Sequence, residues 1–184
     1  MKNPLPALLA ALAFLIPAAA VQAAKPTTAR EIRTQAYQSL AMLHVEAPET
    51  ARLGRDAYAV LVFPQIRGFG FLGGFEHGHG VLFMNRVAVD YYNLHAVSGG
   101  AQIGWRKFGY AIFFMTEESF DKFIKTKGID IGINATATVD SGGFSVHKSN
   151  TTLVHDTVEY IFDEDGMMFR LGLQFNRITE AHPR

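Results

Sequence analysis

The stretch 97–123 constrains the fold most, because a glycine-rich strand, an apolar strand and a short helix follow one another within it. Ile103 and Trp105 stand two apart, the period of a strand with one buried face. Residues 110–115 are apolar throughout, which indicates a second strand that is covered on both faces. Thr116 is then expected to cap a short helix, since its hydroxyl can accept a hydrogen bond from an unpaired backbone N–H.

The first 23 residues have the pattern of a secretory signal peptide. A basic start precedes an apolar run over 5–20 that is too short to span a bilayer, and small residues follow at 21–23. Removing them would leave 161 of the 184 residues, with 16 basic and 17 acidic side chains. We therefore expect a single exported domain over 24–184, located in the periplasm and possessing its own hydrophobic core.

The composition narrows the class of protein further. A charge balance near zero argues against nucleic acid as a partner, because its recognition usually leaves a strongly basic surface. The sequence has no cysteine. The fold must then depend on its core rather than on disulfides, and the usual site of an N-terminal lipid anchor is absent.

Helical signals dominate the segment that follows the leader. In 25–54, Ile32, Ala36, Leu40 and Leu43 recur at spacings of four and three, which predicts an amphipathic helix. Its apolar face can dock on a sheet or touch a membrane, and the sequence leaves both open. A second short helix is expected to open at 48–50 and to close near Gly54.

Strand signals dominate from residue 58 onward. We expect a buried strand over 58–63 that Pro64 ends, a glycine and aromatic alternation over 68–75 that favours bending, a turn at 76–80 and a return strand over 81–84. Later strands are expected at 87–97, 129–139 and 144–147, and a closing hairpin is expected to turn at 163–166. The sequence thus predicts an α+β fold: a strongly bent antiparallel sheet or partial barrel, flanked by N-terminal helices and one short internal helix.

Two patterns that could indicate cofactor or metal sites are incomplete. Gly68, Gly70 and Gly73 fit a dinucleotide fingerprint, but the third glycine does not open a helix, as pyrophosphate binding would require. His77 and His79 could face one side of an extended segment, yet a closed zinc site needs three or four ligands. We interpret these histidines as turn or surface residues and expect neither a cofactor nor a metal.

No assembled catalytic motif is evident either. The acidic segment 163–166 resembles part of a calcium loop, but Gln174 occupies the position of the distal glutamate. Ser98 precedes two glycines and lacks an identifiable base, and no nucleophile elbow is present. We expect no enzymatic activity and name no catalytic residue.

A group of cations surrounds the predicted internal helix: Arg106, Lys107, Lys122, Lys125 and Lys127. Lysines near a helix C-terminus complement its dipole, which is a sufficient structural reason for them. As a patch for anionic lipid, three lysines would contribute about 3 kcal/mol at ~1 kcal/mol each, against about 8 kcal/mol for micromolar affinity. A lipid site would therefore need apolar surface as well. The candidates are the aromatic strand with Phe69 and Phe71, and the first helix with Arg30, Ile32, Arg33 and Leu40.

Five separated motifs resemble the SYLF domain family in order and spacing. They are 59–64, 68–71 with 78–82, 100–104, 113–116 and 162–166, and together they extend over nearly all of the chain after the leader. The resemblance implies a lipid-binding domain, and it places a membrane-active amphipathic segment on 30–43. In the family, eukaryotic members bind phosphoinositides and some fungal members bind actin, whereas exported bacterial members consist of a single domain.

The function expected from the sequence is therefore binding of phospholipid or of a membrane surface in the bacterial envelope, without catalysis. Actin is not expected as a partner of an exported bacterial chain, although a homo-oligomer is compatible with the sequence. The alternative is a structural or protein-interaction module of the envelope, whose glycine-aromatic strands pair with another chain and which has no lipid specificity.

Overall fold

The computed structural model describes residues 28–126, 130–140, 146–149 and 156–183. The elements run in the order α1 (Ala29–Glu46), α2 (Glu49–Asp56), β1 (Ala59–Met84), β2 (Val87–Phe114), α3 (Glu117–Lys125), β3 (Asp130–Asp140), β4 (Val146–Ser149) and β5 (Thr157–Ala181). The strands form one antiparallel sheet in the order β1-β2-β5-β3, with β4 also paired to β5. The predicted α+β fold with a bent, open antiparallel sheet is confirmed.

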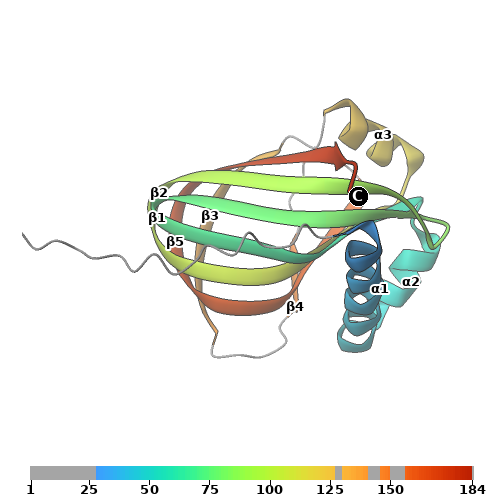
Figure 1. Ribbon diagram of the computed structural model, residues 1–184, viewed down its shortest axis with the longest axis horizontal. Helices are drawn as coiled ribbons and strands as arrows, with labels where there is room; N and C mark the ends of the chain where they lie inside the picture. Colours follow the sequence, from blue (N-terminus) through green and yellow to red (C-terminus); the bar gives the residue numbers. More distant parts are fainter. Residues whose placement is uncertain (1–27, 127–129, 141–145, 150–155, 184) are drawn as a thin grey trace, which may run out of the picture.

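Three very long strands build most of the sheet. β1, β2 and β5 have 26, 28 and 25 residues, far beyond the five or six residues of a typical strand. Figure 1 shows them turning back at one end of the molecule, on the left, while α1, α2 and α3 lie at the opposite end. Each long strand therefore contributes two halves to the molecule.

Several predicted strand ends are wrong for this reason. β1 passes Pro64 with a register shift between Phe63 and Ile66, and it continues through 76–80, where a turn was expected. β5 likewise runs through 163–166 as strand and not as a hairpin turn. The turn that joins β1 to β2 is instead at Asn85 and Arg86, which both have positive φ, at 51° and 65°, as a two-residue hairpin turn requires.

The bend lies where β1 and β2 change register. Phe71 pairs with Ile103 and Gly73 with Gly99, so three residues of β2 stand opposite one residue of β1. Such a bulge bends a strand and increases its twist. Gly104 beside it has a φ of 131°, which side chains with a Cβ rarely adopt. Glycines therefore permit the bend at this point.

Glycine also lets the two halves of β1 pack closely together. A Cβ at Gly78 would lie 2.7 Å from Cγ1 of Ile66, and one at Gly80 would lie 2.6 Å from the ring of Phe63. Neither position leaves room for a methyl group. Since residues 66 and 78 lie on different halves of one strand, their contact holds the folded-back arrangement.

The core consists of two layers that the strands separate. Leu61, Phe63, Ile112 and Phe114 belong to one buried cluster, together with Phe123 of α3. The alternate residues Val60, Val62, Ala111 and Phe113 belong to a second cluster, which contains Ile32, Ala36 and Leu43 of α1. The prediction that 110–115 is covered on both faces is confirmed for the strand residues 111–114.

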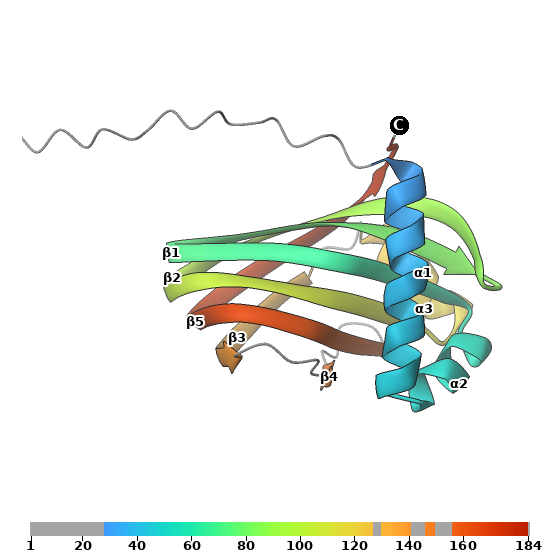
Figure 2. The same ribbon diagram turned by 60° about the horizontal axis from the view of Figure 1, so that its bottom comes forward.

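The helices begin where the sequence indicates. Thr116 accepts a hydrogen bond from the Ser119 N–H at 3.2 Å and caps α3, as predicted. α1 begins with a similar exchange between Thr28 and Glu31, and it lies across the strands in Figure 2. Its Ile32 is only 3% exposed, so the structure favours the docked helix over the membrane-touching one. α2 continues beyond the expected end at Gly54.

Candidate functional site

The bend of the sheet carries a continuous set of exposed apolar side chains. Three pairs of β1 and β2 around the bend supply it: Phe69 with Trp105, Phe71 with Ile103, and, beyond the glycine pair Gly73 and Gly99, Phe75 with Val97. We name these six residues the bend surface. Their exposed fractions are 65%, 74% and 39% for Phe69, Phe71 and Phe75, and 54%, 61% and 55% for Val97, Ile103 and Trp105.

The alternation of residue types explains why large rings stay in solvent here. Successive strand residues point to opposite faces, so Gly68 and Gly70 face the interior and are buried, whereas Phe69 and Phe71 face out. The rings of Phe69 and Phe75 come within 6.4 Å between centroids, although six residues separate them. The two halves of β1 therefore contribute to one apolar surface, and not to two.

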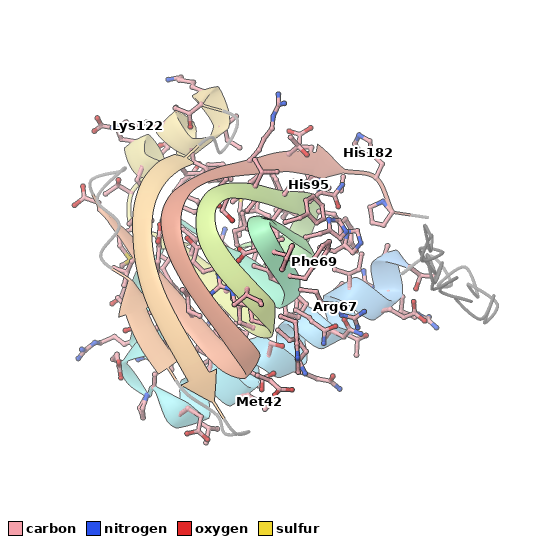
Figure 3. All side chains as sticks on the ribbon, turned by 90° about the vertical axis from the view of Figure 1, so that its left-hand side faces the viewer. Met42, Arg67, Phe69, His95, Lys122 and His182 are labelled. Atoms are coloured by element: carbon pink, nitrogen blue, oxygen red, sulfur yellow. The ribbon has the colours of Figure 1, made fainter. Side chains whose placement is uncertain are left out.

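Cations border the bend surface on one side. Arg67 and Lys107 form the pair next to Phe69 and Trp105, and Arg67 is exposed. Asp165 of β5 pairs with Lys107 on the other side of β2. Figure 3 looks onto this end of the molecule and shows Arg67 and Phe69 there. A ligand with an anionic head and an apolar body would find both kinds of contact.

Histidines border the bend surface on the other side. His77 and His95 form the pair after Phe75 and Val97, and the Nδ1–H of His79 donates to Oδ1 of Asn93 at 2.7 Å. Nε2 of His77 and Nε2 of His79 are 3.3 Å apart, as expected when His77 donates to an unprotonated nitrogen. The expected turn is therefore wrong: His77 and His79 are half-buried strand residues, and His95 beside them is exposed.

The surroundings of His77 favour its neutral form. Burial lowers its pKa, and the charges of His79 and His95 lower that pKa further, against a smaller opposite effect of the Leu94 backbone. Within the described ranges, no group of three or more histidine, cysteine or acidic side chains is placed to hold a metal ion.

The structure does not bring the sequence-predicted site residues together. Lys122 and Lys125 are exposed on α3, at the end of the molecule opposite the bend (Figures 1 and 2), and Lys125 lies 3.8 Å from Asp121. Arg30 and Arg33 are exposed on α1, whereas Ile32 is in the core and Leu40 is half-buried. Lys127 lies outside the described residues. Phe69, Phe71 and Lys107 are the members of the predicted set that meet at the bend.

Arg106 is a correction to the predicted cationic group. It is 7% exposed and donates from Nη2 and Nε to Oε1 of Glu76, at 2.7 and 3.0 Å. Its guanidinium carbon also lies 4.1 Å from the ring centroid of Phe108. Because strand neighbours face opposite sides, Lys107 can border the bend surface while Arg106 points inward. Arg106 is therefore an interior residue and not a surface cation.

Sequence reasoning missed several members of this surface. Phe75, Val97, Ile103 and Trp105 were not named as site residues, nor was Arg67. The period-two spacing of Ile103 and Trp105 was available, but it was interpreted as a buried face. A better signal for the exposed surface is the alternation of glycine with apolar residues, which occurs both in 68–71 and around Gly104.

No helix in the described part of the chain is long and apolar enough to cross a membrane. A comparison with protein-family models, with curated proteins and with solved structures finds no match for this chain. Its function must therefore be argued from the surface itself.

Proposed function

We propose that this protein is an exported, periplasmic, non-catalytic lipid-binding protein that attaches to phospholipid membranes through the bend surface. The observation that carries the proposal is the exposure of six large apolar side chains in three strand pairs around the bend. Contiguous exposed apolar patches on a soluble protein usually mark sites of interaction with proteins, ligands or membranes. The resemblance to the SYLF family supports the choice of lipid among these partners.

The expected affinity follows from the exposed area. Burying a large apolar side chain completely contributes roughly 1.5–3 kcal/mol. The six side chains are already about half covered, so inserting them would contribute roughly 1 kcal/mol each, or about 6 kcal/mol together. Arg67 and Lys107 would add ~1 kcal/mol each at an anionic surface. The total of about 8 kcal/mol corresponds to micromolar binding.

This mechanism differs from the one expected from the lysines of α3. Lys122 and Lys125 lie at the opposite end of the molecule (Figures 1 and 2), so they cannot reach a bilayer in which the bend is inserted. Attraction through Arg67 and Lys107 would orient the molecule, and the six apolar side chains would supply most of the binding free energy. Binding should consequently weaken only moderately with salt, since screening acts on the charges alone.

Trp105 provides a direct test, because it is the one tryptophan of the chain and lies in the bend surface. Titration with vesicles of phosphatidylglycerol and phosphatidylcholine should shift its emission to shorter wavelength, as the indole leaves water. The same vesicles should carry the protein in flotation. No blue shift and no flotation at low salt would refute the proposal.

Matched variants distinguish membrane binding through the bend surface from non-specific adsorption of exposed apolar side chains. Phe69→Ser with Phe71→Ser removes two exposed rings of the bend. Val45→Ser with Val87→Ser removes two exposed apolar side chains, 76% and 60% accessible, outside the bend surface. We expect the first pair to abolish flotation and the second to leave it unchanged. Equal loss in both pairs would contradict a specific role of the bend.

A protein-interaction role is the second candidate, and one observation favours it. β1 lies at the edge of the sheet order, and an edge strand can pair with another chain. This hypothesis predicts an oligomer that grows with protein concentration in sedimentation velocity and is indifferent to vesicles. Membrane binding predicts the reverse response in both measurements.

A further inference from the structure

A pocket lies at the end of the molecule that carries the helices, away from the bend. Its volume is about 400 Å³, and it is lined by residues of α1, α2, strand β1 and the turn that follows β1. The apolar lining comes from Leu40, Ala41, Ala51, Ala57, Val60 and Phe83. This volume is near the lower end of the roughly 300–1,000 Å³ of small-molecule sites, which suits one short chain better than a two-chain phospholipid.

The charged side chains that line the pocket are two arginines. Arg55 and Arg86 line it and are exposed, and none of the described residues that line it is acidic. Across the described residues, neither arginine has a carboxylate within ion-pair distance. Two exposed arginines beside an apolar wall are complementary to an anionic head joined to an apolar tail.

The fold holds this pocket in shape. Tyr37 of α1 donates from its hydroxyl to the carbonyl of Arg86 at 3.3 Å, and its ring meets Phe83 edge-on at 4.9 Å between centroids. On the other side, His44 and Thr50 are joined at 2.8 Å between Nδ1 and Oγ1, and Thr50 donates to the Ala47 carbonyl at 2.6 Å. α1, α2 and the β1–β2 turn are therefore tied together around an open space.

We propose that this pocket binds a single-chain, monoanionic amphiphile, with its carboxylate at Arg55 and Arg86 and its chain against Leu40, Val60 and Phe83. The site is independent of the proposed membrane attachment, because its lining contains no residue of the bend surface. His44 lines the pocket, and burial and Arg55 lower its pKa. A carboxylate bound beside it would oppose that shift, so binding should be accompanied by proton uptake as the pH falls below the ordinary histidine pKa of about 6.5.

Calorimetric titration with octanoate, 1-octanol and butyrate tests the two parts of the ligand separately. Octanoate should bind to one site, whereas octanol lacks the charge and butyrate lacks the chain. We expect 1-octanol and butyrate each to bind at least about tenfold more weakly than octanoate. The reason is the loss of a charge-assisted contact for octanol and of several buried methylenes for butyrate. If octanol bound as tightly as octanoate, the proposed role of the anionic head would be refuted. If butyrate bound as tightly, the proposed role of the apolar tail would be refuted.

Variants assign the binding to this pocket. Ala41→Phe places a ring in the space from an exposed helix position, and Gln38→Phe adds the same ring to α1 outside the pocket lining. Arg55→Gln with Arg86→Asn removes the charge, and asparagine tolerates the positive φ at position 86. Arg52→Gln is the charge control on the same helix.

The expected result is loss of octanoate binding in Ala41→Phe and at least about a tenfold loss in the double arginine variant. The Gln38→Phe and Arg52→Gln controls should bind octanoate normally. The bend variant Phe69→Ser with Phe71→Ser should also bind it normally, which keeps failure of this proposal distinct from failure of membrane attachment. Unchanged binding in both pocket variants would refute the site, even if vesicles bind.

Discussion

The buried ion pair between Glu76 and Arg106 connects the two halves of the bent sheet, and its removal tests how the bend is held. Glu76 belongs to the second half of β1, whereas Arg106 pairs in register with Gly68 of the first half. The two side chains are 3% and 7% exposed, with 2.7 Å between Nη2 and Oε1. Glu76→Gln keeps the shape of this contact and removes the negative charge.

The expected cost follows from burial rather than from the short distance alone. Removing one partner of a buried pair takes away the opposite charge that compensates the other, which destabilises a protein by roughly 3–5 kcal/mol. Because glutamine can still accept one hydrogen bond, we expect about 3 kcal/mol, near the lower end of that range. With a total stability of roughly 5–15 kcal/mol for a domain, this is a large fraction.

Urea denaturation measures the effect. With a slope of about 1–3 kcal/mol/M, a loss of about 3 kcal/mol should lower the midpoint by roughly 1–3 M. Asp121→Asn is the control, because Asp121 and Lys125 are an exposed pair at 3.8 Å, for which about 0–1 kcal/mol is expected. If Glu76→Gln changes stability no more than this control, the pair does not hold the halves together.

Replacing both partners separates the charge from the contact. Glu76→Met with Arg106→Met removes the ion pair and leaves two apolar side chains inside the bend. Such replacements of buried pairs are often neutral or stabilising by about 1–4 kcal/mol. We therefore expect the double variant to be more stable than Glu76→Gln. A double variant that is less stable than Glu76→Gln would contradict the view that the loss of charge compensation dominates the cost of Glu76→Gln.

Three further predictions concern the close packing, the helix cap and pH. Gly80→Ala should lower stability by about 1–3 kcal/mol in thermal unfolding, since its methyl group would overlap the ring of Phe63 at 2.6 Å; an unchanged melting temperature would mean that the halves can separate at no cost. Thr116→Ala should cost about 1 kcal/mol by loss of the bond from the Ser119 N–H, and Thr116→Asn should restore most of it. Folding lowers the pKa of His77. The contribution of His77 to the stability of the fold is therefore complete above its pKa in the unfolded chain, about 6.5, and is lost as the pH falls toward its lower pKa in the folded protein. Urea titrations at pH 7.5 and 5.5 should show a smaller pH difference for His77→Asn than for the parent.

The sequence was sufficient for features that depend on neighbouring residues. The cap at Thr116 needs only a hydroxyl, a following acidic turn and an apolar stripe, and all three stand within ten positions. The coverage of residues 111–114 on both faces follows from an unbroken apolar run, and bending follows from the glycines of 68–74. These signals act locally, so no partner strand has to be known.

The course of the long strands depends on residues far apart, and it could not be predicted from local patterns. Pro64 and the glycines of 76–80 are typical of strand ends and turns, but in β1 they mark a register shift and a close approach to Ile66 and Phe63. Local composition cannot distinguish a chain that reverses beside itself from one that bends together with its neighbour. The same limit explains Arg106: its charge suggested the surface, and only the position of Glu76 reveals its partner.

Glycine and aromatic residues alternate along β1 at the bend, so the residues that stabilise the fold and those proposed to bind a membrane lie on opposite faces of the strand. On the inner face, Gly78 and Gly80 are confined by Ile66 and Phe63, so a change there must disturb packing. On the outer face, Phe69 and Phe71 remain 65% and 74% exposed and contribute little to the core. Bending the sheet requires the glycines but not these rings, since smaller polar residues would satisfy the strand equally well. The stability of the fold therefore does not explain these exposed rings, and binding of an apolar partner is the explanation that their chemistry favours.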